Sequence, residues 1–333
     1  MTREELTRRA QAIFPQHERL QSLYGNTGIE TRYTCQPAEW YHQPHSWEER
    51  TSAFQDHALD LLERVAVDAV ARADLRLEDI DVIVTNTVTG LAIPSLDARL
   101  MNRLPFRRDV ERLPMLGLGC GAGVAGLARS ARMAQAVPDS VVLFLTVDLC
   151  TLCLRTTDPS RTMFVATALF GDGAAGLVLK SRNAAKGNAA PAGPRVLAWG
   201  EHLWPDSEHI MGWDIKNDGF GVVLSPELPS LMRNRFGDAL DQFLAHAALS
   251  RADLDGFLLH PGGRRVLEEV QTVLGLTERD LAYSWRVLRD YGNMSSATAL
   301  FVLKEALGDG AQGRHLLAAF GPGFSGYFVL LEL

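Results

Sequence analysis

Apolar residues recur along the chain with two different spacings, and these spacings predict where helices and strands form. Residues 54–73 carry apolar side chains three and four positions apart, which is typical of a helix with one buried face, and residues 80–84 form a β-branched run typical of a short strand. Residues 113–120 predict a second strand, residues 125–136 a helix, and residues 141–147 a buried strand. This region therefore alternates strand, turn and helix.

The same pattern continues to the end of the chain. Residues 168–179 predict an interior strand with a Gly-Asp-Gly bend near its start. Residues 255–260 predict a strand, residues 264–276 a helix with one apolar face, residues 290–307 a polar turn that enters a helix, and residues 326–333 a closing strand. Repeated strand-turn-helix units predict an α/β fold with its chemistry at the carboxyl ends of the strands.

A segment of low complexity separates the two series of elements. Residues 180–196 are rich in Ala, Gly and Pro, which is typical of a boundary between two halves. The length of 333 residues also suits two domains, or one large domain built from two halves. We therefore expect an N-terminal half over residues 1–185 and a C-terminal half over residues 195–333.

Composition and charge exclude several classes of protein. Hydrophobic residues make up 47% of the chain and charged residues 22%, which excludes intrinsic disorder. The 33 Lys and Arg against 40 Asp and Glu give a net charge of −7, so we expect no nucleic-acid partner. No apolar run is long enough to insert in a membrane and the N-terminus is not typical of a signal peptide, so we expect a cytoplasmic protein. Four cysteines are too few for a disulfide framework.

Cys120 is the first candidate for chemistry. It lies where an apolar strand ends and a helix begins, between Gly119 and Gly121. Amide groups at a helix start and the helix dipole stabilise a thiolate, and small neighbours let a substrate approach the sulfur. The position suits a nucleophile, and a small buried cysteine at a tight turn is the alternative interpretation.

The residues after Cys120 also match a nucleotide-binding motif. Residues 121–126 fit GxGxxG, follow a strand, open a helix, and precede a strand that ends at Asp148. A dinucleotide site on residues 113–148 is therefore a second hypothesis. A cysteine directly before the first glycine has no role in binding a pyrophosphate, which argues against it.

His260 and Asn293 complete a possible constellation with Cys120. His260 ends a strand before Pro261-Gly262-Gly263, so we expect its imidazole at a rim of the fold. Asn293 lies in a turn that opens a helix, where a helix N-cap is the alternative. His260 can activate the Cys120 thiol, and His260 and Asn293 can donate to an oxyanion, including the enolate left when a malonyl thioester loses CO₂. These residue types favour decarboxylative Claisen condensation.

Six segments of the chain form an ordered set of motifs: NTVTGLAIPSLDARLMNRL (86–104), GLGCGAGVAGLARS (117–130), ALFGDGAAGLVL (168–179), HPGG (260–263), YGNMSSA (291–297) and FGPGFSG (320–326). In this order they resemble the motifs of the type III polyketide synthases, which are chalcone-synthase-like members of the thiolase superfamily. The resemblance implies a thiolase fold, with two pseudo-repeated α/β halves in a layered αβαβα arrangement. It also implies that the catalytic residues are Cys120, His260 and Asn293.

The resemblance implies further roles around the reaction cavity. Phe170 matches a phenylalanine that gates the pocket and orients malonyl, and Val222 falls near the second gating phenylalanine of the plant enzymes. The residues matched to the cavity lining are Cys150, Cys153, Gly212 and Ile93, of which Ile93 would reach the cavity of a dimer partner. The residues matched to the mouth that binds coenzyme A are Arg265 and Arg19.

The resemblance implies a homodimeric acyltransferase that uses an acyl-CoA starter and malonyl-CoA, without a metal or any other cofactor. Residues 39–50 and 211–229 look more like the bacterial members that make alkylpyrones and alkylresorcinols. We therefore expect a fatty acyl starter on Cys120, malonyl extension, and cyclisation to an alkylpyrone or alkylresorcinol. The alternatives are an enzyme like ketoacyl-ACP synthase III that performs one condensation, an NAD(P)-binding oxidoreductase, and a non-catalytic thiolase-fold binding protein.

Overall fold

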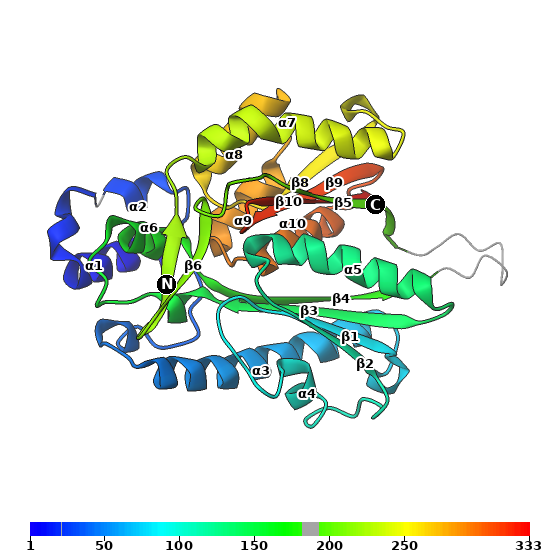
Figure 1. The fold of residues 1–333 in the computed structure, drawn as a ribbon, viewed down its shortest axis with the longest axis horizontal. Coiled ribbons are helices and arrows are strands. Elements are labelled where there is room, and N and C mark those ends of the chain that lie inside the picture. Colours follow the sequence, from blue (N-terminus) through cyan, green and yellow to red (C-terminus); the bar gives the residue numbers. More distant parts are fainter. Residues whose placement is uncertain (21, 182–192) are drawn as a thin grey trace.

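The chain forms five layers, helix, sheet, helix, sheet and helix, in a computed structural model (Figure 1). The structure describes residues 1–20, 22–181 and 193–333, and for residues 18–20 it describes the backbone alone. The expected boundary between the halves is at residues 185–195. Of these, residues 185–192 lie outside the described residues. The layers bring the two halves of the sequence face to face.

The first sheet belongs to the N-terminal half. Its strands lie in the order β2 (Glu111–Met115), β1 (Val82–Asn86), β3 (Val141–Leu149) and β4 (Asp172–Lys180). β1 pairs in parallel with β2 and β3, and β4 pairs antiparallel to β3. β1 and β3 are buried along their whole length because helices cover both faces of the sheet. β2 contains Pro114 and is partly exposed, as suits an edge strand.

The second sheet belongs to the C-terminal half and repeats part of this arrangement. Its order is β5 (Arg195–Leu203), β10 (Ser325–Glu332), β9 (Arg314–Gly321) and β8 (Gly256–Leu259). β8 pairs in parallel with β9, and β10 runs antiparallel to both β9 and β5. Each sheet therefore contains a parallel pair followed by an antiparallel strand, which is β1, β3, β4 in the first and β8, β9, β10 in the second.

Two helices fill the layer between the sheets (Figure 1). α5 (Ala122–Ala136) contacts β1 and β3 of the first sheet and β9 and β10 of the second. α10 (Ala297–Gly308) packs beside α5 and contacts β4 and β8. Both helices are buried over much of their circumference, which explains why their sequences are rich in small and apolar residues.

Amphipathic helices form the outer layers. α3 (Trp47–Arg72) covers the outer face of the first sheet, and α7 (Leu228–His246) with α8 (Arg264–Leu274) covers the outer face of the second. α3 begins several residues before the expected position because Ser46 caps it. The Ser46 hydroxyl accepts a hydrogen bond from the Glu49 amide, and the Glu49 carboxylate accepts one from the Ser46 amide.

The remaining elements lie around this five-layer body. A helical cluster at one end of the molecule, seen at the left of Figure 1, consists of α1 (Arg3–Ile13), α2 (Ser22–Asn26) and α6 (Arg161–Leu169). A hairpin of β6 (Met211–Lys216) and β7 (Gly219–Leu224) crosses beside it. The other helices are α4 (Leu96–Leu100), α9 (Ala282–Tyr291) and short 3₁₀ turns at Pro15–Leu20, Trp40–His42, Leu77–Asp79 and Arg251–Asp253.

One expected element is wrong at its start. The sequence pattern predicts a strand from residue 168, but Ala168 and Leu169 are the last residues of α6. This helix starts because the Ser160 hydroxyl caps the Met163 amide, and it ends where Phe170 turns extended. A short apolar run is compatible with a helix and with a strand, so the cap residues decide its conformation.

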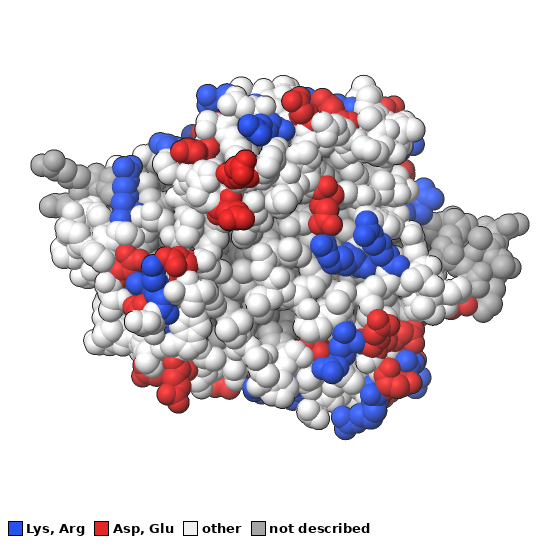
Figure 2. Space-filling model, viewed as in Figure 1, with Lys and Arg blue, Asp and Glu red and all other residues white. Residues whose placement is uncertain are grey.

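The surface carries both signs of charge. On the face shown in Figure 2, acidic and basic side chains lie interspersed around a broad uncharged central area. Among the described residues, no helix combines the length and apolar character that crossing a bilayer requires.

Candidate active site

Cys120 lies at the start of the central helix α5, as the sequence pattern predicts. The chain makes one 3₁₀ turn, η4 (Gly119–Gly121), and enters α5 at Ala122. Gly119 has a φ of 52°, and a Cβ there would lie 2.4 Å from Cδ of Pro322, so only glycine suits this turn. η4 contacts β9 and β10. The first half therefore carries Cys120, but holds it against the second sheet.

The glycines after Cys120 serve helix packing. A Cβ at Gly123 would lie 2.1 Å from the Ser296 carbonyl oxygen, and a Cβ at Gly126 would lie 2.1 Å from the Phe144 ring. Ser296 and Phe144 therefore occupy the space beside Gly123 and Gly126 that a bound pyrophosphate would need. This close packing contradicts the dinucleotide-binding hypothesis for residues 113–148.

His260 directly follows β8. Its amide donates to the Ala318 carbonyl on β9 at 2.8 Å, and the Pro261-Gly262-Gly263 turn then leads into α8. The expectation that its imidazole lies at a rim is wrong, since only 3% of the residue is exposed. Neither ring nitrogen has a hydrogen-bond partner among the described residues. A Cβ at Gly262 would lie 3.7 Å from Nε2, so this glycine leaves room beside that nitrogen.

Asn293 is buried between Cys120 and the turn after His260. Its Nδ2 donates to the Gly262 carbonyl at 3.0 Å, and its Oδ1 accepts from the Ser295 amide at 2.8 Å. The Cys120 sulfur lies 4.0 Å from Asn293 Oδ1. The N-cap interpretation is wrong, because Ser296 is the N-cap of α10. Asn293 therefore links Cys120 to the turn that follows His260.

A buried carboxylate fixes this loop, and sequence reasoning missed its role. Asp148, at the end of β3, accepts from the Val88 amide at 2.8 Å and from the Ser296 amide and hydroxyl at 3.0 and 2.5 Å. These bonds tie the first sheet to the start of α10, three residues after Asn293. The sequence carried one signal of this role, which is that Asp148 stands in an otherwise apolar run. A carboxylate buried in such a run needs several hydrogen-bond partners.

Burial controls the protonation states in the site. It raises the pKa of the Cys120 thiol to about 11, and the interactions of the thiol with Ser295 and Asn293 only partly oppose this. Burial alone lowers the pKa of His260 to about 3. The resting pair at neutral pH is thus a thiol and a neutral imidazole. The position of Cys120 at a helix start therefore does not keep its sulfur deprotonated at rest, although the sequence argument favoured a thiolate.

Phe170 is coupled to Asn293 through the backbone. The two residues form a parallel bridge, in which the Gly171 amide donates to the Asn293 carbonyl at 2.9 Å and the Asn293 amide to the Leu169 carbonyl at 3.0 Å. Val222, which the resemblance matches to the second gating position, lies on β7 and packs against the helical cluster of α1, α2 and α6. Backbone hydrogen bonds thus hold Phe170 and Asn293 side by side.

The residues matched to the cavity lining lie in different surroundings. Cys150 and Cys153 are buried free thiols in the 3₁₀ turn η5 (Cys150–Cys153), and the Cys153 thiol donates to the Thr89 carbonyl at 3.5 Å. A Cβ at Gly212, on β6, would meet only Pro322 at 4.0 Å. Pro322 also touches the turn that carries Cys120, so the open space at Gly212 lies near that turn.

Two of the remaining predicted residues are exposed at the surface, and the side chain of the third lies outside the described residues. Ile93 is 93% exposed on the surface of the single chain. Arg265 is exposed at the start of α8, directly after the turn that follows His260. The side chain of Arg19 lies outside the described residues. Within those described, no group of three or more His, Cys, Asp or Glu side chains is placed to hold a metal ion.

Comparisons with protein families now add to this geometry. Residues 4–193 match the family described as FAE1/type III polyketide synthase-like protein, and residues 196–332 match the C-terminal domain of chalcone and stilbene synthases. The chain belongs to the type III polyketide synthases. It is therefore an acyl-transferring condensing enzyme, and the ketoacyl-ACP synthase III, oxidoreductase and non-catalytic alternatives are set aside.

Individual relatives agree with the family models. The chain is 40% identical to 1,3,6,8-tetrahydroxynaphthalene synthase of Streptomyces peucetius over 94% of this chain and 83% of the relative. It is 34% identical to a putative chalcone synthase of Bacillus subtilis over 97% and 91%. The crystal structure of the tetrahydroxynaphthalene synthase of Streptomyces coelicolor matches with a TM-score of 0.93 and 31% identity, covering 100% of this chain and 95% of that one. These matches confirm the thiolase fold.

Proposed function

We propose that Cys120 of this type III polyketide synthase carries the growing chain and that His260 and Asn293 drive its extension. The observation that carries the proposal is the 4.0 Å approach of the Cys120 sulfur to the Asn293 amide, beside a buried imidazole whose nitrogens have no described partner. Polar groups left free in a buried site suit a substrate that brings charge into it.

In the loading step, the Cys120 sulfur attacks the carbonyl carbon of an acyl-CoA thioester. The neutral imidazole of His260 takes the thiol proton and then gives it to the departing coenzyme A sulfur. A new thioester forms on Cys120 and the old one breaks. This route needs no resting thiolate, which agrees with the raised pKa of Cys120.

In the extension step, malonyl-CoA loses CO₂ and leaves an enolate. Nε2 of His260 and the second N–H of Asn293 Nδ2 donate to the enolate oxygen, because the first N–H is held by the Gly262 carbonyl. The enolate carbon then attacks the thioester on Cys120, a carbon–carbon bond forms, and the Cys120 sulfur leaves. Repetition gives a polyketide chain that cyclises.

For the starter we propose a fatty acyl group, with an alkylpyrone or alkylresorcinol as the product. The support is the small size of the residues matched to the cavity lining. Gly212 leaves open space next to Pro322, which touches the turn that carries Cys120. Cys150 and Cys153 are buried and have short side chains. An alkyl chain needs only a narrow apolar channel and gains free energy for each methylene that it buries.

A second candidate starter is malonyl-CoA itself. The relatives named for 1,3,6,8-tetrahydroxynaphthalene favour it, because the oxygens of that ring system are spaced as two-carbon units would leave them and the molecule has no alkyl chain. The same loading and extension steps apply to both starters. Only the space beside Cys120 differs between them.

We also propose that the enzyme works as a homodimer. Ile93 is 93% exposed and Leu91 beside it 43% exposed, and a second copy of the chain would cover these apolar side chains. Ile93→Asp should shift the sedimentation coefficient from that of a dimer to that of a monomer. A wild-type monomer in solution would contradict this part of the proposal.

The experiment for the function is a mass-spectrometric product assay. The enzyme is incubated with malonyl-CoA alone, and with malonyl-CoA plus a short, an aromatic or a long-chain acyl-CoA, with Cys120→Ala as the control. The proposal predicts alkylpyrones or alkylresorcinols from the long-chain starter only in the wild type. Aromatic products from malonyl-CoA alone would support the second candidate, and no product from any starter would contradict both.

A further inference from the structure

A cavity that Cys120 does not line lies between the helical cluster and the five-layer body. Its empty space is about 630 Å³, including its opening to solvent. Its apolar wall comes mainly from α1, and the residues are Leu6, Ala10, Ile13, Phe14 and Leu154. Cys120, His260 and Asn293 do not line it, but Phe170 does. The cavity therefore shares the gate residue with the reaction site and is otherwise separate.

Three arginines line this cavity, and none of its lining residues is acidic. Arg9, Arg32 and Arg155 each have one buried guanidinium nitrogen without a hydrogen-bond partner, namely Nε of Arg9, Nε of Arg32 and Nη1 of Arg155. Buried donors of this kind are rarely left unpaired in folded proteins. Three of them around one cavity indicate that a ligand supplies the acceptors.

Arg32 makes the strongest case. It is only 2% exposed, and its Nη1 donates to the carbonyls of Thr167 and Phe170 at 2.7 and 2.9 Å, where α6 ends. Its guanidinium bonds go to backbone carbonyls and not to a carboxylate among the described residues, and Tyr24 and Asp172 act on it only through their charge. A buried cation without a paired anion is costly, so an anion in the cavity would stabilise it.

The other two arginines are already partly paired. Arg9 Nη2 lies 3.0 Å from Glu5 and 3.6 Å from Glu39, and its Nη1 lies 3.3 Å from Nε2 of His42. These contacts leave its Nε free, so Arg9 keeps a charged donor on the wall.

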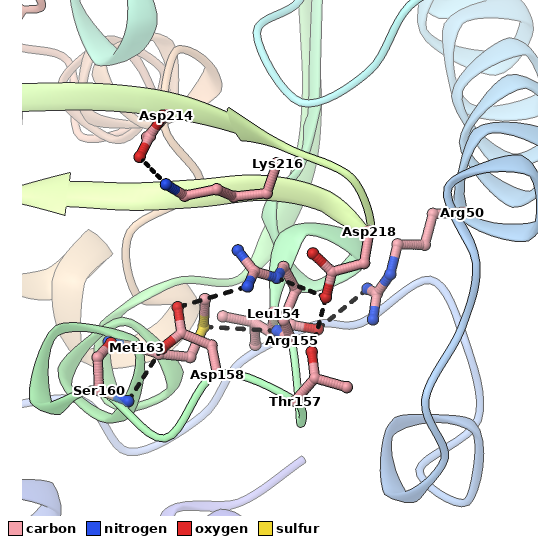
Figure 3. A network of polar contacts seen from close by, with 10 residues as sticks. All are labelled: Arg50, Leu154, Arg155, Thr157, Asp158, Ser160, Met163, Asp214, Lys216 and Asp218. Atoms are coloured by element: carbon pink, nitrogen blue, oxygen red, sulfur yellow. Dashed lines mark hydrogen bonds and ion pairs between the residues drawn. The ribbon is translucent and has the colours of Figure 1, made fainter.

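Arg155 joins the hairpin to the helical cluster, as Figure 3 shows. Its Nε binds Asp218 at 3.1 Å, and its Nη2 lies 3.8 Å from Asp158. Arg50 supports the same loop by donating to the Leu154 carbonyl at 3.0 Å. Arg155 is therefore held by structural bonds and contributes its charge to one end of the cavity.

We propose that this cavity is a binding site for the carboxylate end of an aliphatic acid, with the carboxylate between Arg32 and Arg9 and the chain along the apolar wall of α1. The apolar wall fits a hydrocarbon chain, and Arg32 and Arg9 fit the two oxygens of a carboxylate. Because Arg32 also binds the Phe170 carbonyl, an occupant contacts the residue that supports the gate. This site is additional to the proposed function and does not depend on its starter.

The test is calorimetric titration of the full chain with octanoate, and with octanol as the uncharged probe of equal chain length. The Cys120→Ala variant is used throughout, so that the reaction site cannot form a covalent adduct. Arg9→Gln removes one charged donor, Ala10→Phe fills the cavity, and Arg76→Gln is the control for loss of an exposed arginine elsewhere. Arg32→Gln is included, with its melting temperature measured, since loss of this buried residue can unfold the chain.

The proposal predicts saturable binding of one octanoate, with octanol and the Arg9→Gln variant at least tenfold weaker. Ala10→Phe should abolish binding, while Arg76→Gln should bind within twofold of the parent. Saturating malonyl-CoA should leave octanoate binding in place. Absence of octanoate binding, equal affinity for octanol, unchanged affinity in Arg9→Gln, or displacement by malonyl-CoA would each overturn the proposal.

Discussion

The two halves of the molecule share a unit of two parallel strands and one antiparallel strand but contribute to the site in different ways. In the N-terminal half, Cys120 lies at the first turn of the central helix α5. In the C-terminal half, the corresponding helix α10 starts with Ser296 and carries no proposed catalytic group at its cap. That half instead offers His260 at a strand end and Asn293 in the loop before α10. In the proposed mechanism, one half supplies the nucleophile and the other supplies the hydrogen-bond donors.

This difference teaches why the interface between the halves has to be rigid. An oxyanion site works only if its donors are fixed relative to the nucleophile before the reaction. Here Asp148 of the first half binds Ser296 of the second, and the backbone at Phe170 is paired with Asn293. Both links hold the donor loop against the half that carries Cys120.

Removing the nucleophile tests the division of labour most strongly. Cys120→Ala should abolish product and acyl adduct, but it should still release CO₂ from malonyl-CoA, because His260 and Asn293 remain. The measurements are product mass, intact protein mass and CO₂ release. Loss of CO₂ release together with product would show that the two halves do not act separately.

Removing a donor should have the opposite pattern. Asn293→Ala should still accept an acyl group on Cys120, while CO₂ release and product formation fall about 10²- to 10³-fold, as for loss of one oxyanion donor. Single-turnover loading and steady-state extension, measured on the same sample, separate the two effects. An equal loss in both steps would assign Asn293 a structural role instead.

Replacing the imidazole should change the pH dependence of Cys120 reactivity. His260, as a neutral base, can take the thiol proton at any pH above its own pKa of about 3, so labelling of wild-type Cys120 by iodoacetamide should change little between about pH 6 and about pH 9. In His260→Gln only the thiolate reacts, so labelling should be slower and should rise about tenfold per pH unit toward the pKa of about 11 that burial imposes. Peptide mapping of the label against pH measures this, and identical profiles would remove His260 from the loading step.

The same variant should alter acid stability. Folding lowers the pKa of His260 to about 3, so below about pH 6.5 the unfolded chain takes up a proton that the folded chain does not. This residue should therefore cost the wild type about 1.4 kcal/mol of stability per pH unit as the pH falls from 6.5 toward 3. In denaturant titrations at pH 7 and pH 5, His260→Gln should lose less stability than the wild type. An equal loss in both would contradict the burial of an uncharged imidazole.

The smallest expected effect concerns the packing of the central helix. Gly126→Ala places a Cβ against the Phe144 ring, which should cost about 1–3 kcal/mol and lower the melting temperature by several degrees. Gly275→Ala, in the exposed cap of α8, is the matched control, since nothing lies within 4 Å of its Cβ and only its φ of 66° opposes the change. A larger loss in Gly275→Ala would contradict the packing role of Gly126.

Much of this fold follows from local patterns, and the parts that do not are decided by contacts distant in sequence. The spacing of apolar residues predicts α5 within three residues and β3 within two, because both are continuous buried runs. The same reasoning predicted a strand where α6 ends. Ser160 starts that helix, and three apolar residues at its end are too few to reveal a helical period. It also left α1 and the β6–β7 hairpin undescribed.

The candidate site shows a similar division. The position of Cys120 at the start of α5 was predictable, because an apolar strand, small residues and a helical run follow one another in the sequence. The burial of His260 was not predictable, because β9 and Asn293 come from later in the chain and close over it. The clamp by Asp148 was hidden for the same reason, as its partner Ser296 is 148 residues away.

The most direct test of the account is intact-protein mass spectrometry with peptide mapping after incubation with an acyl-CoA and no malonyl-CoA. The account predicts one acyl group per chain, on Cys120, in the wild type and in Asn293→Ala, and none in Cys120→Ala. An acyl group on Cys35, Cys150 or Cys153 would contradict the assignment of the nucleophile. The same adduct in Cys120→Ala would contradict it as well.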